Sequence, residues 1–202
     1  MDVDKIQFTK IELQIVKYLF KHYKDKFNSR QLAKLLNINH AHASKLCNSL
    51  FKKLLLKKEE LANAVYFSFD YESKLAIKFM EYLFVLEEKN FPEWLSVVLH
   101  NLQKFNNHIT LGLVFGSSTK TSTFNDVDVF LVYEKNKIKV IKKIKEEIRN
   151  SELIGRPIRY VDVLEEDIQL NKNNNVFYNI LSDNLIFYNS EKYVEVIKKC
   201  RK

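Results

Sequence analysis

The spacing of apolar residues in the first third of the chain predicts three helices. Apolar side chains recur every three or four positions in three segments, residues 8–22, 30–36 and 40–53. This spacing places them on one face of a helix. Thr9 and Glu12 have the spacing of a capping box at the start of the first helix, and Ser29 is placed to cap the second. The segment Asn37-Ile38-Asn39 is expected to form the turn before the third helix.

Two further apolar segments predict a β-hairpin after these helices. Residues 54–56 are apolar, residues 65–69 are apolar except for Ser68, and residues 57–64 connect them. A helix, a short turn, a second helix and a hairpin resemble, over residues 29–56, the winged-helix domains of archaeal and bacterial regulators. The sequence therefore predicts a winged helix-turn-helix domain over residues 1–70, in which the second helix of the motif can enter the major groove of DNA.

Residues 71–106 are expected to be a helical connector. Apolar positions at helical spacing continue over residues 71–88 and 94–105, and Asn90-Phe91-Pro92 interrupts them. We expect these helices to pack against their neighbours, with a dimer surface as the alternative.

The pattern changes over residues 107–202, where strands and helices alternate. Two apolar runs, residues 109–115 and 127–133, predict strands that are joined by a polar loop. Further segments predict an amphipathic helix, a strand, a helix, a strand and a closing helix, at residues 136–150, 158–163, 176–181, 185–188 and 190–202. The chain as a whole is thus expected to be an α+β protein whose C-terminal part has a small mixed β-sheet flanked by helices.

The junction between the first two of these strands carries the candidate chemistry. Asp126 and Asp128 are two positions apart at the start of a strand, so both side chains point to the same side. Two carboxylates this close repel each other unless a cation compensates, and Mg²⁺ prefers such oxygen ligands. Gly116 lets the backbone approach a phosphate closely, and Ser117 and Ser118 supply amide and hydroxyl donors.

This arrangement resembles the polymerase-β-type nucleotidyltransferases. Their signature is an apolar residue and Gly-Ser, a short loop, and then Asp-apolar-Asp-apolar, which here reads Phe115-Gly116-Ser117, eight residues, and Asp126-Val127-Asp128-Val129. The family adds a third carboxylate on a later strand, for which Asp162 is the match. The resemblance covers residues 107–189. The loop lacks the glycine that small members often have, and Asn125 stands where they often have serine.

The resemblance implies a nucleotidyltransferase domain over residues 107–202. Asp126, Asp128 and Asp162 would hold two Mg²⁺ ions, with Asp162 also helping to activate the acceptor, while Gly116, Ser117 and Ser118 would bind the phosphates of a nucleoside triphosphate. Lys120 is a further residue that could meet the triphosphate. Arg159 leaves its strand on the side opposite to Asp162 and is expected to be a surface or packing residue rather than a triphosphate ligand.

Charge and exposed side chains point to nucleic acid as a partner of the N-terminal domain. The net charge is +8, and residues 1–70 hold 13 lysines and arginines against 7 aspartates and glutamates. The expected groove-facing residues are His40, His42, Ser44, Lys45 and Asn48, with Lys52 and Lys53 toward phosphates. Glu59 and Glu60 near the wing tip oppose a phosphate contact there, and a protein-interaction role is the alternative.

The remaining composition excludes some classes of protein. Cys47 and Cys200 lie far apart and have no zinc-site spacing. No apolar run approaches the length of a membrane span, so a cytoplasmic protein without membrane contact is expected.

The sequence therefore predicts a Mg²⁺-dependent nucleotidyltransferase with a nucleic-acid-binding winged helix. Its acceptor would be RNA, a protein partner or a small molecule. The alternative is a catalytically inactive DNA-binding regulator whose nucleotidyltransferase-like domain senses nucleotide or mediates assembly. A protein-interaction adaptor without either activity is a third alternative.

Overall fold

The computed structural model describes residues 7–61, 63–151 and 155–201. The chain forms two compact units, residues 1–80 and 81–202. Helix α4 (Lys74–Glu88) spans the boundary between them. Of the expected connector, residues 71–80 group with the N-terminal unit and residues 81–106 with the C-terminal unit.

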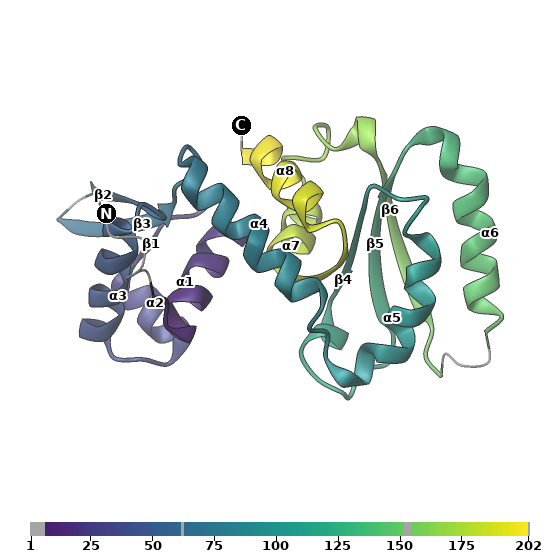
Figure 1. The fold of residues 1–202 in the computed structure, drawn as a ribbon, viewed down its shortest axis with the longest axis horizontal. Helices are drawn as coiled ribbons and strands as arrows, with labels where there is room; N and C mark the ends of the chain where they lie inside the picture. The colour runs from purple at the N-terminus through teal and green to yellow at the C-terminus, as the bar shows by residue number, and fades with distance from the viewer. Residues whose placement is uncertain (1–6, 62, 152–154, 202) are drawn as a thin grey trace. The chain divides into compact units, whose positions relative to one another are not determined.

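The N-terminal unit consists of helices and a small antiparallel sheet (Figure 1). Its elements are α1 (Lys10–Lys21), β1 (Phe27–Asn28), α2 (Ser29–Leu36), α3 (His40–Lys52), β2 (Leu56–Leu61) and β3 (Ala64–Phe69). The strands are ordered β1-β3-β2, and β2 pairs with β3 from Leu56 opposite Phe69 to Leu61 opposite Ala64. Three helices followed by a hairpin are confirmed in the predicted order, while β2 extends over residues 57–61, which the sequence assigned to the connection.

The apolar face of each helix forms the core of this unit. Ile15 and Phe20 of α1, Leu32 of α2, Leu50 of α3 and Phe67 of β3 are almost fully buried. Their burial supplies the main driving force for folding. Strand β2 was harder to predict because it lies at the edge of the sheet, where its exposed Lys57–Glu60 side chains give no apolar alternation.

The N-terminal caps fix where the first two helices begin. The Thr9 hydroxyl accepts a hydrogen bond from the Glu12 amide, and the Glu12 carboxylate accepts one from the Thr9 amide, which confirms the capping box. Helix α2 is capped by Asn28 rather than by Ser29, with Gln31 completing that box. Asn28 and Ser29 are both good caps, so local sequence alone did not choose between them.

Glu12 also joins α1 to α3 through a buried polar network. Its carboxylate accepts hydrogen bonds from the Ser49 hydroxyl at 3.0 Å and from Lys53 Nζ at 2.8 Å, and the residue is 3% exposed. Burial raises the pKa of Glu12, but the bonds from Lys53, Thr9 and Ser49 outweigh it, so its pKa lies below the ordinary glutamate value. The network therefore favours the charged carboxylate in the folded state.

The C-terminal unit has a four-stranded mixed sheet. Its elements are α5 (Ser96–Leu102), β4 (Leu111–Phe115), β5 (Val127–Tyr133), α6 (Ile138–Arg149), β6 (Ile158–Leu164), α7 (Asn175–Ser182), β7 (Asn184–Tyr188) and α8 (Ser190–Arg201). The strand order is β6-β5-β4-β7, in which β5 and β6 are parallel and the other pairs are antiparallel. The expected α+β class with a small mixed sheet is confirmed. Lys202 lies outside the described residues.

Helices cover both faces of this sheet (Figure 1). Val127, Val129 and Leu131 of β5 belong to a core cluster with residues of α5 and α6. On the other face, the rings of Phe130 and Phe177 of α7 meet edge to face at 5.8 Å between centroids. The odd- and even-numbered residues of β5 therefore face different sets of helices.

None of the helices that the structure describes combines the length and apolar character needed to cross a membrane.

Replacing Glu12 with alanine is expected to destabilise the N-terminal unit by about 2 to 3 kcal/mol, because it removes a helix cap and two buried hydrogen bonds to a charged group. Hydrogen exchange of the α1 amides in the intact chain, corrected for intrinsic rates, measures this loss. Glu60→Ala, at an exposed position of β2, is the control.

The loss of stability caused by Glu12→Ala is expected to depend on pH. Because folding lowers the pKa of Glu12, its contribution is present above the ordinary glutamate pKa and is lost as the pH falls through the folded value. The difference between wild type and Glu12→Ala should therefore shrink in acid. A difference that stays constant through that range would contradict the role assigned to the carboxylate.

Candidate functional site

The acidic pair lies at the N-terminal end of β5, as the sequence predicted. Asp128 is paired with Phe115 of β4, and Asp126 immediately precedes the strand. Burial raises the pKa of Asp128, the nearby Asp126 raises it further, and Arg159 partly offsets both. The two carboxylates are thus close enough to repel each other at the end of the sheet.

Gly116 connects β4 to the loop and lies directly beneath Asp128. Its φ is +78°, a conformation that side chains other than glycine rarely adopt. A Cβ atom placed on Gly116 would lie 2.4 Å from Asp128 Oδ2. Glycine is therefore required here for two reasons, the backbone conformation and the close approach of the carboxylate.

Ser117 and Ser118 have different environments within the turn Ser117–Thr119. Ser117 is exposed. Ser118 is fully buried, with its hydroxyl 3.4 Å from the Phe115 carbonyl and its own carbonyl accepting a hydrogen bond from Trp94 Nε1 at 3.1 Å. Ser117 is thus available to a ligand, whereas the Ser118 side chain helps to hold the turn and does not face solvent, contrary to the expectation from sequence.

Asp162 lies on the opposite face of the sheet from the acidic pair. In the parallel pairing of β5 with β6, Asp162 is beside Leu131 and therefore shares its face. The Tyr133 hydroxyl donates a hydrogen bond to Asp162 at 3.1 Å, and Lys145 of α6 forms an ion pair with it. The structure thus does not bring the three aspartates together, and the expected two-ion site lacks the ligand that Asp162 was to provide.

The position beside Asp128 on β6 is occupied by Arg159. Its guanidinium lies 2.8 Å from Asp126 Oδ2, so the two form an ion pair. Sequence reasoning placed Arg159 on the correct side of its strand, but treated it as a surface or packing residue because the strand pairing was not known. The structure makes it part of the acidic site.

A second ion pair lies between the loop and the end of α7. Lys120 Nζ is 2.6 Å from Asp183 Oδ2, and both side chains are more than half exposed. Asp183 precedes β7, which pairs with β4 next to Gly116. Asp183 lies between the predicted helix over residues 176–181 and the predicted strand over residues 185–188, where nothing in the local pattern relates it to the loop.

The acidic pair has the donor chemistry for Mg²⁺. Mg²⁺ is commonly held by one or two carboxylates together with water and substrate phosphates. Within the described residues, no group of three or more histidine, cysteine or acidic side chains is placed to hold a metal ion. Asp126 and Asp128 could therefore hold a Mg²⁺ ion only with oxygens from a ligand or solvent, and Asp126 would also have to exchange its ion pair with Arg159.

In the N-terminal unit, α3 presents part of the expected nucleic-acid face. His42, Lys45 and Lys52 are exposed, and Asn48 is half-buried. Spacings of three and four residues place these four on one side of the helix. Asn48 also donates a hydrogen bond from Nδ2 to the Ser44 carbonyl at 2.8 Å.

The other three expected contact residues have intramolecular roles or are less accessible. A ring nitrogen of His40 lies 2.9 Å from the Ser29 hydroxyl, and Ser44 is half-buried. Lys53 donates to Glu12 and to the Gln7 carbonyl. Lys53 therefore stabilises the unit and is a poor candidate for a phosphate contact, which corrects the sequence expectation.

Comparisons with known proteins give little guidance. No protein-family model matches the chain, and no curated protein matches it. Among solved structures, a mutant of ZitR from Lactococcus lactis is 18% identical, with a TM-score of 0.31, 50% of this chain covered and 75% of that one. The adhesin competence repressor AdcR from Streptococcus pyogenes is 17% identical, with a TM-score of 0.33 and coverage of 73% and 84%. Neither likeness identifies the fold or the function of this chain.

Gly116→Ala is expected to destabilise the chain by about 1 to 3 kcal/mol, because alanine is strained at this φ and its Cβ would overlap the Asp128 carboxylate. Thermal unfolding measures the change. Gly155→Ala is the matched control, since a Cβ at Gly155 meets no atom within 4 Å. Equal effects of the two substitutions would contradict the close packing of Gly116 against Asp128.

Proposed function

We propose that this chain is a nucleic-acid-binding regulator, with a winged helix in its N-terminal unit and a nucleotidyltransferase-like, nucleotide-binding domain in its C-terminal unit. The observation that carries the choice of regulator over transferase is the pairing of β5 with β6. This pairing puts Arg159 beside Asp128 and puts Asp162 on the other face.

Support for nucleic-acid binding comes from α3 and from the charge of its unit. In a helix-turn-helix the second helix enters the major groove, and here that helix is α3, which follows α2 after a short turn. His42, Lys45, Asn48 and Lys52 share one side of it. Lysines in this position would contact phosphates, and histidine and asparagine can read base edges.

Support for nucleotide binding comes from the end of the sheet in the C-terminal unit. Asp126 and Asp128 would hold Mg²⁺, and the exposed Ser117 would donate to a phosphate oxygen. Arg159 would leave Asp126 and pair with a phosphate of the nucleotide, because a guanidinium fits a phosphate in the same way as a carboxylate. The nucleotide would then change the charge of the unit without being consumed.

Nucleotidyl transfer is the second candidate function, and the packing of Gly116 against Asp128 favours it. This packing holds one carboxylate at the end of β5 next to a loop that could bind phosphate. In that case the acceptor hydroxyl of RNA, a protein or a small molecule would attack the α-phosphorus, and pyrophosphate would leave. Catalysis would depend on positioning and on charge neutralisation by Arg159 and by the cation that the two carboxylates would hold.

Replacing Lys45 and Lys52 together with glutamine is expected to weaken binding to a random-sequence DNA duplex at least tenfold. The slope of log K against log salt should fall by about 2, since each lysine that contacts a phosphate contributes about one released ion. Fluorescence anisotropy over a salt series measures both effects. Lys10→Gln with Lys104→Gln removes the same charge at exposed positions outside α3. An unchanged salt slope in the α3 variant would remove α3 from the interface.

Replacing Asp126 and Asp128 together with asparagine is expected to abolish Mg²⁺-dependent binding of a fluorescent ATP analogue and to leave DNA binding intact. The reason is that asparagine keeps the shape of aspartate but lacks the charge that holds the cation. Equal nucleotide affinity in wild type and variant would contradict the assignment of Asp126 and Asp128 to the nucleotide site.

Wild type and the Asp126→Asn/Asp128→Asn variant also distinguish the two candidate functions. Incubation with α-labelled nucleoside triphosphates, Mg²⁺ and cell extract should give no labelled acceptor if the chain is a regulator. Label that appears with wild type and not with Asp126→Asn/Asp128→Asn would establish the transferase instead, and digestion with RNase or protease would identify the acceptor class.

A further inference from the structure

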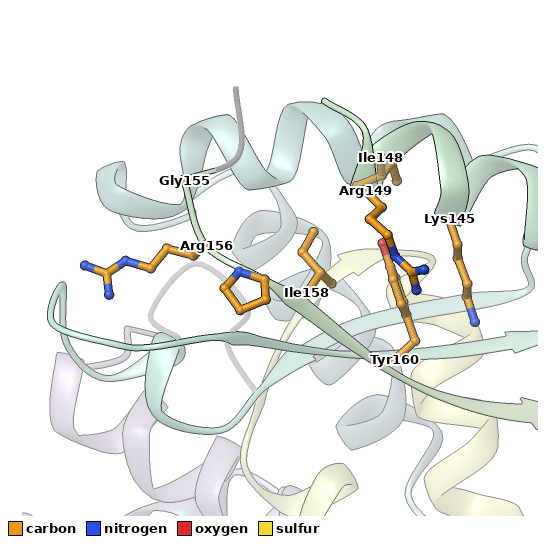
Figure 2. Close-up of a pocket in the computed structure, with 8 residues that line it drawn as sticks. Lys145, Ile148, Arg149, Gly155, Arg156, Ile158 and Tyr160 are labelled. Atoms are coloured by element: carbon orange, nitrogen blue, oxygen red, sulfur yellow. The ribbon is translucent and has the colours of Figure 1, made fainter. Parts of the chain in front are cut away.

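A pocket lies between α6 and β6, on the face of the sheet away from the acidic pair. Its volume is about 380 Å³, which is in the range of small-molecule sites. Lys145 and Arg149 of α6 line one side, and Ile158 and Tyr160 of β6 line the other (Figure 2). Ile158 and Tyr160 also pack against the core cluster that includes α6, so the floor of the pocket is held by the fold.

The polar groups of the pocket are cations and one hydroxyl. The Tyr160 hydroxyl is buried and has no hydrogen-bond partner in the part of the chain that the structure describes. Burial raises the pKa of Tyr160, Asp162 raises it further, and Arg149 offsets part of the shift. The hydroxyl is therefore neutral at ordinary pH and can donate a hydrogen bond. A buried hydroxyl without a partner is costly, so a ligand oxygen at this position would be stabilising.

In the close-up, the side chains of Arg149 and Lys145 both extend from α6 toward β6, where Tyr160 lies (Figure 2). Lys145 Nζ is 4.6 Å from the centroid of the Tyr160 ring and is also paired with Asp162. No acidic residue within the described ranges is paired with Arg149, although its charge acts on Tyr160. The guanidinium of Arg149 is therefore the charge in this pocket that an anion would pair with first.

Arg156, a third basic residue of the lining, turns away from the pocket (Figure 2). Its guanidinium donates to the Phe124 carbonyl and lies 5.4 Å from the centre of the Phe124 ring. It holds the loop before Asp126 and is not counted among the ligand groups.

We propose that this pocket binds a nucleoside monophosphate, with the phosphate at Arg149, Lys145 and the Tyr160 hydroxyl and the base against the apolar side chains. A planar guanidinium fork and a lysine match a phosphate dianion, and the Tyr160 hydroxyl supplies one more donor. Pro157 and Ile158 give the lining an apolar surface on which a flat ring can lie. This site needs no metal ion, and it is separate from the acidic pair that the proposed function uses.

Calorimetric titration of the intact chain with adenosine 5′-monophosphate in EDTA tests the proposal, because the absence of divalent ions leaves the acidic site without its cation. We expect the nucleotide to bind, inorganic phosphate to bind at least tenfold more weakly, and adenosine to give no measurable heat. Failure of the monophosphate to bind would overturn the proposal. Phosphate binding as tight as that of the nucleotide would overturn the assignment of a base to the apolar side.

Single substitutions test which side chains of the pocket bind the nucleotide. Arg149→Gln should weaken binding at least tenfold, and Tyr160→Phe, which removes a single oxygen, about threefold to tenfold. Lys139→Gln removes a charge from a different side of α6 and should stay within twofold of wild type. Wild-type affinity in both Arg149→Gln and Tyr160→Phe would refute the site, provided that thermal unfolding confirms the fold of each variant.

The variant of the acidic pair distinguishes this proposal from the proposed function. Asp126→Asn/Asp128→Asn should bind adenosine monophosphate in EDTA as wild type does. Loss of binding in that variant would place the nucleotide at the acidic pair and overturn the pocket assignment, whatever the outcome of the DNA-binding and label-transfer experiments.

Discussion

The chemistry of the C-terminal unit depends on the parallel pairing of β5 with β6. This pairing fixes which residues of β6 stand beside the carboxylates, because residues paired across parallel strands share a face. The register places Arg159 beside Asp128, and it places Asp162 three positions further along and on the other side. A shift of one residue would exchange the two faces and expose the apolar side chains that now form the core.

Arg159 offsets part of the repulsion between the two carboxylates, and glycine leaves space for one of them. Asp126 is paired with Arg159, and Asp128 lies over the backbone of Gly116, where no side chain competes for space. Burial and the neighbouring Asp126 make the charged form of Asp128 less favourable, which is why its pKa is raised. An ion pair of this kind contributes little to stability on its own when one partner is largely exposed, as the Arg159 side chain is at 72%. The role proposed for this ion pair is therefore in ligand binding and not in stability.

Much of the fold could be predicted from the sequence, because the apolar periodicity of α1, α3, β4 and β5 is strong and agrees with their caps and turns. Strand β2 was only partly predicted, since an exposed edge strand is defined by hydrogen bonds and not by buried side chains. The acidic pair and Gly116 were found because their spacing is local. The position of Asp162 could not be found in this way, because alternation within β6 says which residues share a face but not which face meets Asp128.

The side chains whose roles could not be predicted correctly from the sequence are those whose partners come from distant segments. Arg159 meets Asp126 across 33 positions of sequence, and Lys53 meets Glu12 across 41. In both cases the structure gives the basic residue an internal carboxylate partner that its own segment of sequence did not indicate. The two ion pairs differ in the burial of their side chains, however. Lys53 is bound to a carboxylate that is almost fully buried, so its release would leave an unpaired charge inside the N-terminal unit. Asp126 is 16% exposed, against 5% for Glu12, and Arg159 is 72% exposed, so exchange of this partner costs less. The degree of burial of each pair, and not the residue type, therefore decides which cation can take part in binding.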